Sequence, residues 1–361
     1  MRIIFDNIIY SLQRSGGGSV YWTELIKRFY SSDIETIFYD SIKSDNIFRN
    51  SLDLGETKKE IKYGLAIRRY LPFYSKESEK HIFHSSYYRY SNNFNAINIT
   101  TIHDFTTEKF RHGLAREVNL WQKRLAVKKS SGVICISENT KRDLLHYVPD
   151  IDERKVKVIY NGVSDDFYHI NSEFSISDKD SKFADLENFR YLLYIGHRTA
   201  YKNFYIAVRT AANFISEYKF VIIGESFTDE EKGMVEEILG NNYVVLSNLN
   251  NEKLNFLYNK AFALLYPSSY EGFGIPIVEA MKTGCCVVAA NNSSIPEVAG
   301  DAALLIDSIN EEKMVNAVKL LKNTVLREDL KEKGFKQSKK FNWDLTFIEY
   351  CKFYLELYNE R

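Results

Sequence analysis

Short apolar runs rich in β-branched residues alternate with amphipathic stretches along the whole 361-residue chain. In the first half the runs are RIIFDN, ETIFYD, HIFHSS, INITTIHD, GVICISE and KVKVIYNG. A second series follows a polar interval: RYLLYIG, YKFVIIGE, YVVLSN, AFALLYPS, CVVAAN and AALLID. Continuous apolar strands between helices are typical of parallel sheets covered on both faces. The pattern predicts an α/β fold of two doubly wound, Rossmann-like domains that face each other across a cleft, where ligands would bind.

The polar stretch 164–189 separates the two series of strands. It is rich in serine and aspartate and has no clear period, which is typical of a connection between domains. We therefore predict an N-terminal domain over 1–165 and a C-terminal domain over 166–342. The remaining segment, 343–361, is expected to pack back on the N-terminal domain.

Two helices can be placed from the spacing of apolar residues. VYWTELIKRFY, 20–30, repeats large apolar side chains every four residues, and WDLTFIEYCKFYLELY, 343–358, has a similar pattern. In the second helix we expect Leu345, Ile348 and Phe353 on or near one face.

Composition narrows the class of protein. Hydrophobic residues make up 45% and charged residues 27%, and no apolar run approaches the roughly 20 residues that span a bilayer. The N-terminus lacks a signal-peptide layout, so a cytoplasmic protein is expected. The four cysteines have no C-x-x-C spacing and the seven histidines are scattered, which predicts buried thiols and no metal site.

Charge is balanced overall but uneven along the chain. Residues 1–165 hold 26 lysines and arginines against 20 acids, and residues 166–361 hold 22 against 28. This asymmetry suggests that the halves face different partners, but it is too mild to indicate nucleic-acid binding.

The stretch SSYEGFGIPIVEAMKTG, 268–284, is the strongest chemical signal. Glu271 and Glu279 lie eight residues apart where a strand is expected to end and a helix, Ile275 to Lys282, to begin. The glycines allow a sharp turn close to a ligand, and the free N–H groups of the helix start favour an anion or a polar group. Two carboxylates at different depths of the cleft could accept hydrogen bonds from the hydroxyls of a sugar and from those of a ribose. An exposed Glu271 and a Glu279 that only balances the helix dipole remain the alternative.

YIGHRTAYKN, 194–203, ends the first strand of the second series. Arg198 and Lys202 follow Gly196 at four-residue spacing, in a turn that suits a diphosphate. Cations at a helix start oppose the dipole, so phosphate would explain them better than two solvated side chains do.

Two further loops follow strands of the first series. In SLQRSGGGSVYW, Gly16–Gly18 precede a helix and could contact phosphate through backbone amides. A dinucleotide site is disfavoured, although Asp40 ends the next strand, because the G-x-G-x-x-G spacing is missing. In TTIHDFT, His103 lies at a strand end and could donate to a sugar hydroxyl or a departing phosphate; otherwise it is a structural histidine held by Asp104. The pair of acids in DID, 150–152, is expected to be a solvated loop.

Together these motifs resemble glycosyltransferase family 4, a group of retaining enzymes with the GT-B fold. EGFGIPIVE matches the E-x7-E signature of that family, and TGCCVVAANNSSIPEVAGDAALLID matches the stretch that follows it. YIGHRTAYKNF, TIHDFTTEKF and ICISENTKRDL match other parts of the family pattern, so the resemblance covers nearly the whole chain.

The resemblance implies a role for each matching residue. Arg198 and Lys202 would neutralise the donor diphosphate, Glu271 would hold the donor sugar, and Glu279 would hold the ribose. His103 would face the sugar from the N-terminal domain. The implied donor-binding set is completed by Gly17, Phe273, Gly274 and Ile275. The reaction would retain anomeric configuration and would need neither a metal nor another cofactor.

The form G-x-R-x-x-Y-K-N looks most like bacterial mannosyltransferases that build O-antigens and capsules. It implies GDP-mannose as the favoured donor, a UDP-sugar as the next, and a glycan or lipid-linked oligosaccharide acceptor. Two alternatives stay open: a nucleotide-sugar epimerase or hydrolase with the same architecture, and a non-catalytic sugar-nucleotide-binding subunit.

The segment KKEIKYGLAIRRYLPFYSK, 58–76, interleaves lysine and arginine with large apolar residues. It lies in the more basic half and could dock on anionic headgroups at the inner face of the membrane. An ordinary surface helix is the alternative.

Overall fold

The computed structural model describes residues 1–41, 44–60, 64–170, 186 and 188–360. The chain forms two compact units. One comprises Met1–Gly162 with the C-terminal helix, and the other comprises Val163–Asn342. The predicted boundary after residue 165 falls close to this division. Residues 171–185 and 187 of the expected connection lie outside the described residues.

The first unit is built on one parallel sheet with the strand order β3-β2-β1-β4-β5-β6-β7. Its strands are β1 (Arg2–Asp6), β2 (Glu35–Ser41), β3 (Lys58–Glu60), β4 (His81–Ser85), β5 (Ala96–Ile102), β6 (Gly132–Cys135) and β7 (Val156–Val158). The six predicted strands are present. The additional strand, β3, lies at the edge of the sheet beside β2 and has the charged sequence KKE, with both lysines exposed. Because the strand contains no apolar residue, the pattern of apolar runs did not predict it.

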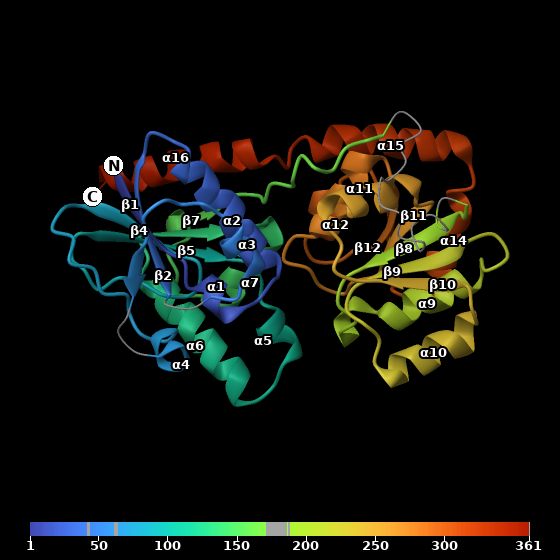
Figure 1. Ribbon diagram of the computed structural model, residues 1–361, viewed down its shortest axis with the longest axis horizontal. Coiled ribbons are helices and arrows are strands. Elements are labelled where there is room, and N and C mark those ends of the chain that lie inside the picture. The colour runs from blue at the N-terminus through green and yellow to red at the C-terminus, as the bar shows by residue number, and fades with distance from the viewer. Residues whose placement is uncertain (42–43, 61–63, 171–185, 187, 361) are drawn as a thin grey trace. The chain divides into compact units, whose positions relative to one another are not determined.

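Helices cover both faces of this sheet (Figure 1). Helices α2 (Gly17–Tyr30) and α16 (Trp343–Glu360) pack together on one face, and α6 (Leu114–Lys129) and α7 (Glu138–Tyr147) lie on the other. The shorter helices are α1 (Ile9–Leu12), α3 (Ile47–Asn50), α4 (Leu65–Arg68), α5 (Thr106–Phe110) and the 3₁₀ turn η1 (Glu153–Lys155). Asp152 caps η1 through its side chain, so the DID sequence forms a turn and its second acid has a structural role.

Helix α16 packs on the first unit through a different face from the expected one. Leu345 and Ile348 are 49% and 45% exposed, whereas Phe353 is buried. The buried side chains of the helix are Trp343, Thr346, Tyr350, Phe353, Tyr354 and Leu357. Tyrosines can be buried on this face because their hydroxyl groups have polar partners in the core. The hydroxyl of Tyr354 lies 2.5 Å from Nδ1 of His84.

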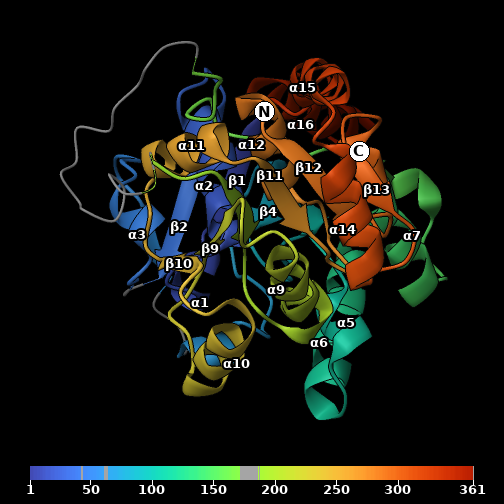
Figure 2. The same ribbon diagram turned by 90° about the vertical axis from the view of Figure 1, so that its right-hand side faces the viewer.

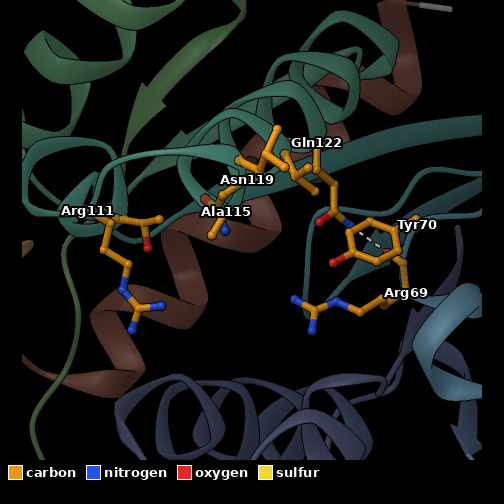
Figure 3. Close-up of a pocket in the computed structure, with 9 residues that line it drawn as sticks. Arg69, Tyr70, Arg111, Ala115, Asn119 and Gln122 are labelled. Carbon is orange, nitrogen blue, oxygen red and sulfur yellow. Dashed lines mark hydrogen bonds between the residues drawn. The ribbon is translucent and has the colours of Figure 1, made fainter.

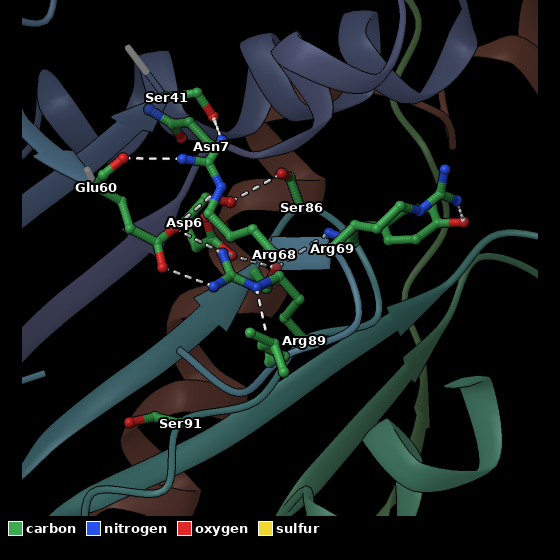
Figure 4. Close-up of polar contacts among 12 residues, drawn as sticks. Asp6, Asn7, Ser41, Glu60, Arg68, Arg69, Ser86, Arg89 and Ser91 are labelled. Atoms are coloured by element: carbon green, nitrogen blue, oxygen red, sulfur yellow. Dashed lines mark hydrogen bonds and ion pairs between the residues drawn. The ribbon is translucent and has the colours of Figure 1, made fainter. Parts of the chain in front are cut away.

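A buried charge network fastens the β3–α4 segment to the sheet (Figure 4). Arg89 pairs with Asp6 at the end of β1 and with Glu60 at the end of β3, each at 2.8 Å. Arg68 donates to the carbonyl oxygen of Glu60 at 2.8 Å and also contacts Ser41. A buried cation is tolerated only when paired in this way. Arg68 therefore has a structural role, in which it holds the end of β3 through these contacts.

The second unit contains another parallel sheet, with the order β10-β9-β8-β11-β12-β13. Its strands β9 to β13 are labelled in Figure 2. All six strands were predicted: β8 (Tyr191–Ile195), β9 (Lys219–Ile223), β10 (Tyr243–Leu246), β11 (Ala263–Tyr266), β12 (Cys286–Ala290) and β13 (Leu304–Ile306). The helices are the 3₁₀ turn η2 (Ala200–Lys202), α9 (Phe204–Ala212), α10 (Asp229–Leu239), α11 (Asn251–Lys260), α12 (Ile275–Thr283), α13 (Ile295–Ala299), α14 (Glu311–Leu320) and α15 (Thr324–Ser338).

The strand order of the second sheet reverses between β8 and β11. Helices α9, α10 and α14 lie on one face of the sheet, and α11, α12 and α15 lie on the other. The connections after β8 and β11 therefore diverge to opposite faces, which leaves room for a ligand at their carboxyl ends. The motifs at 194–203 and 268–284 occupy these two ends.

Candidate functional site

The turn between β11 and α12 has the local structure that its sequence predicts. Gly274 adopts a left-handed conformation with φ of 103°, which favours glycine, and α12 starts at the next residue with Pro276 in its first turn. Gly272, also expected to turn the chain, is not among the described residues with positive φ. The sharp turn therefore depends on Gly274.

Glu271 projects from this turn to Lys202, which follows β8. The Lys202 Nζ and Glu271 Oε1 atoms lie 2.5 Å apart, and both side chains are largely buried. This pair joins the two motifs at the switch point of the sheet.

Serines and an amide hold the Glu271 turn in place. The Ser294 hydroxyl donates to the carbonyl oxygens of Glu271 and Phe273, each at 2.9 Å, and the Glu271 N–H donates to Ser293 Oγ. Asn203, next to Lys202, donates its amide to Ser269 Oγ at 2.7 Å. Sequence reasoning missed these supporting residues, although the NNSS run before α13 has the composition of a polar turn.

Glu279 lies one turn into α12 and has a neutral partner. The hydroxyl of Tyr258, on α11, donates to Glu279 Oε2 at 2.7 Å. Burial raises the pKa of Glu279 to about 7, although the Tyr258 hydrogen bond and the charge of Lys282 oppose that rise. This acid can therefore change its protonation state near neutral pH.

Arg198 has a different environment from Lys202. Its guanidinium forms two hydrogen bonds with Glu231, at 2.8 and 3.0 Å, and donates to the carbonyl oxygens of Glu225 and Ser226. It also lies over the ring of Phe227, 4.9 Å from the ring centroid. Arg198 is thus tied to the loop after β9 and to α10, while Lys202 faces Glu271.

In the first unit, His103 follows β5. Its ring packs edge-on against Tyr21 at 4.7 Å. Burial lowers the pKa of His103 to about 4, with Asp104 opposing and Lys123 adding to the shift, so the imidazole is neutral at pH 7. The Asp104 carboxylate accepts the N–H of Thr106.

The glycine loop also lies in the first unit. Gly16 precedes α2 with φ of 148°, and Gly17 is exposed at the first position of the helix. A Cβ built on Gly17 would meet no heavy atom within 4 Å. Asp40, which the dinucleotide alternative would need for a ribose, is held by Arg49 at 2.7 Å and by Asn7 at 2.9 Å.

Two protein-family models match the chain, and each of them matches mainly one of its two units. Residues 15–167 match the model described as Glycosyltransferase Family 4, and residues 176–337 match the model described as Glycosyl transferases group 1. Escherichia coli O-antigen chain mannosyltransferase B is 43% identical over 95 residues, 26% of this chain. Salmonella typhimurium O-antigen chain mannosyltransferase RfbU is 26% identical over 223 residues, 61% of this chain. The aligned parts span 25% and 59% of those relatives' own lengths.

Solved structures resemble the chain over its whole length. A glycosyltransferase from Rickettsia africae has a TM-score of 0.75 at 18% identity, with 99% of this chain and 98% of that chain covered. Anabaena HepE in complex with UDP-glucose has a TM-score of 0.73 at 16% identity, with 98% of each chain covered. Together with the two doubly wound sheets, these similarities show that the chain has the GT-B fold, and its two halves match two glycosyltransferase family models.

Proposed function

We propose that the protein is a retaining glycosyltransferase that moves a hexosyl group from a nucleotide-diphosphate sugar to a glycan or lipid-linked acceptor in cell-surface polysaccharide synthesis. The observation that carries the proposal is the Lys202–Glu271 pair at the switch point of the second sheet, with Glu279 on the helix that follows. Cationic, anionic and backbone N–H groups converge there, as binding of a diphosphate and a sugar requires.

Each group has a chemical task in this proposal. The C1–O bond to the β-phosphate breaks, the acceptor oxygen forms a new bond to C1 on the same face, and the acceptor proton passes to the departing phosphate. Lys202 and the start of α12 stabilise the negative charge that develops on that phosphate. Glu271 accepts hydrogen bonds from sugar hydroxyls, with Phe273, Gly274 and Ile275 beside it.

The remaining residues of the site orient the donor. Glu279 accepts the ribose hydroxyls, and the neutral imidazole of His103 donates a hydrogen bond to the sugar. Gly17 leaves space for the phosphates beside the start of α2. Arg198 contributes positive potential and holds the loop after β9, since its donors already bond Glu231 and two carbonyl oxygens. Because protein groups supply the positive charge, the reaction is expected to need no metal and no further cofactor.

The donor proposal combines two similarities. Relatives named as O-antigen mannosyltransferases favour GDP-mannose, and the structural neighbour solved with UDP-glucose makes a UDP-sugar the next choice. Such a protein would work in the cytoplasm at the inner face of the membrane. No helix among the described residues is long and apolar enough to cross a bilayer.

The expected membrane segment 58–76 enters the proposal in a changed form. It is not one amphipathic helix: α4 has four residues, and residues 61–63 lie outside the described part of the chain. Of its cations, Arg68 is buried, while Lys58 pairs with Glu77 and Lys59 lies 3.6 Å from Asp40. The contact with anionic lipid is therefore assigned to the end of this segment and its neighbours.

Thermal shifts with GDP, UDP, ADP and dTDP, alone and as sugar conjugates, test the phosphate site. One nucleotide should stabilise the wild-type protein by about 2.7 kcal/mol at 100 times its Kd. Lys202→Ala should lose most of that increment relative to its own baseline, whereas Lys333→Ala, a half-exposed lysine of α15 paired with Asp329, should keep it. A lack of response to every nucleotide would contradict the proposal.

Product analysis tests the reaction itself. The donor should be consumed only with an acceptor, the product should keep the donor's anomeric configuration, and chelation of metals should leave the rate unchanged. Donor turnover without acceptor would instead favour an epimerase or hydrolase.

A further inference from the structure

A cavity of about 400 Å³ opens in the first unit, between the end of α4 and helices α5 and α6. Figure 3 shows the side chains of Arg69 and Arg111 extending from different elements toward the same opening. The other lining residues are Tyr70, Thr107, Leu114, Ala115, Val118, Asn119 and Gln122. None of them belongs to the proposed donor site.

The polar groups of this cavity are incompletely satisfied. Arg69 donates to the Tyr87 hydroxyl through Nη2 at 2.9 Å, but its buried Nε has no hydrogen-bond partner. The buried Asn119 Oδ1 has none either. An unmet donor on a guanidinium is costly, and the positive charge of this guanidinium at the edge of an open cavity favours an anionic ligand there. Arg111, exposed after α5, supplies a second guanidinium from across the opening.

Apolar side chains surround the opening. Leu114, Val118 and Trp121 repeat at helical spacing along α6 and are 84%, 41% and 52% exposed. Tyr70 and Phe110 add exposed rings beside the two arginines. An exposed apolar ridge beside a cationic cavity matches a bilayer surface, where acyl chains lie next to phosphates. The acid on this part of α6, Glu117, pairs with Arg116, so it does not cancel the charge of the cavity.

We propose that this face of α5 and α6 docks on an anionic bilayer, with a lipid phosphate seated between Arg69 and Arg111 and the Leu114–Val118–Trp121 ridge in contact with the acyl region. The inference deepens the membrane contact of the proposed function. It would place the first unit at the surface where a lipid-linked acceptor is found.

Co-sedimentation with vesicles tests this assignment on the full-length chain. The wild-type protein should bind vesicles of phosphatidylglycerol and phosphatidylcholine at low salt, should be released as salt rises, and should not bind phosphatidylcholine alone. Arg111→Gln should weaken binding about fivefold, the effect of one basic residue near an anionic surface. Leu114→Asp should weaken it about tenfold or more, because a leucine side chain that would become buried in the acyl region is lost and a negative charge is added.

Two matched controls lie in the same unit but away from the cavity. Arg154→Gln removes an arginine within η1 whose side chain is 90% exposed, and Phe94→Asp changes a phenylalanine that is 86% exposed before β5. Both should bind vesicles as the wild type does. Because Arg111 and Leu114 are exposed, their variants should keep the wild-type Tm and the nucleotide-induced thermal shift, so this test can fail without the proposed transfer reaction failing.

Three results would overturn the proposal. The wild type could ignore phosphatidylglycerol vesicles at low salt, or Arg154→Gln could weaken binding as much as Arg111→Gln, which would indicate diffuse charge attraction. Inorganic phosphate could instead raise the Tm through Arg111 while vesicles do not bind, which would make the cavity a site for a free anion.

Discussion

Glu271 and Glu279 belong to one motif, but their surroundings give them different chemistry. Glu271 faces the ammonium of Lys202, whereas Glu279 accepts from the neutral hydroxyl of Tyr258. Burial disfavours the charged form of a carboxylate, and it raises the pKa of Glu279 to about 7 although the charge of Lys282 opposes the rise. Glu279 is therefore expected to change its protonation state near neutral pH.

Nucleotide binding should become tighter as pH rises through about 7. The ordinary pKa of a glutamate is 4.5, and burial raises that of Glu279 to about 7 in the folded protein. Below that pH the free protein holds a proton on Glu279, which must leave before both oxygens can accept ribose hydroxyls. Affinity should fall by up to about tenfold for each pH unit below the pKa. Calorimetric titration at several pH values measures this.

Two variants separate Glu279 from other titrating groups. Glu279→Gln should bind more weakly and lose the pH dependence. Tyr258→Phe removes a hydrogen bond that lowers the pKa, so the midpoint should move to higher pH. An unchanged pH profile in Glu279→Gln would contradict the ribose role.

The sequence predicts where these side chains lie better than what they contact. The positions of Glu271, Lys202 and Glu279 at strand ends follow from motif spacing. The partner of Arg198 does not, because Glu231 lies 33 residues away and meets it only once α10 has packed beside α9. Pairings of this kind depend on the assembled sheet.

At the scale of elements, buried strands were the easiest to predict and aromatic helices the hardest. Runs such as ALLY and CVVAA are buried on both faces and read directly as strands. Helix α16 carries apolar residues nearly all round, so its pattern indicates a helix without identifying the packed face. The buried face is set by Tyr350 and Tyr354, whose hydroxyls meet Thr101 and His84.

The start of α16 depends on a glycine that a larger residue should not replace. A Cβ on Gly162 would lie 2.4 Å from the backbone nitrogen of Trp343 and 2.5 Å from its Cα. Because the obstacle is backbone, it cannot move aside as a flexible side chain would. Gly162→Ala should lower the free energy of unfolding of the first unit by about 1–3 kcal/mol, as overpacking does. Urea denaturation monitored by tryptophan fluorescence measures this.

Gly233→Ala, inside α10 of the second unit, is the matched control, and its unfolding is followed by circular dichroism because all three tryptophans lie in the first unit. A Cβ there meets no heavy atom within 4 Å, so the substitution should stabilise the helix by up to about 1 kcal/mol. Equal effects of the two substitutions would show that the approach of Gly162 to Trp343 is not tight.

On the scale of the whole molecule, the two units differ in how the chain builds them. Val163–Asn342 is continuous, whereas the first unit needs residues from both ends of the sequence. Most of the groups proposed to bind the nucleotide, from Arg198 to Glu279, lie in the continuous unit. Gly17 and His103, proposed to lie beside the phosphates and the sugar, lie in the other unit, as does the cavity at Arg69. The main nucleotide-binding groups and the proposed membrane contact are thus assigned to different units.

This division predicts that the segment 163–342, produced alone, folds and keeps the nucleotide-induced thermal shift. Its six-stranded sheet and its hydrophobic cluster are complete within those residues.

Removal of 343–361 from the full chain should instead destabilise the first unit. The deletion removes the buried side chains of Tyr350 and Tyr354 from the core of that unit and leaves a large cavity. Thermal melts of both truncated chains, with and without the preferred nucleotide, measure this. If the isolated segment melts cooperatively but shows no nucleotide-induced shift, donor binding needs the first unit as well. If the chain ending at residue 342 melts as the full chain does, α16 is not part of the core of the first unit.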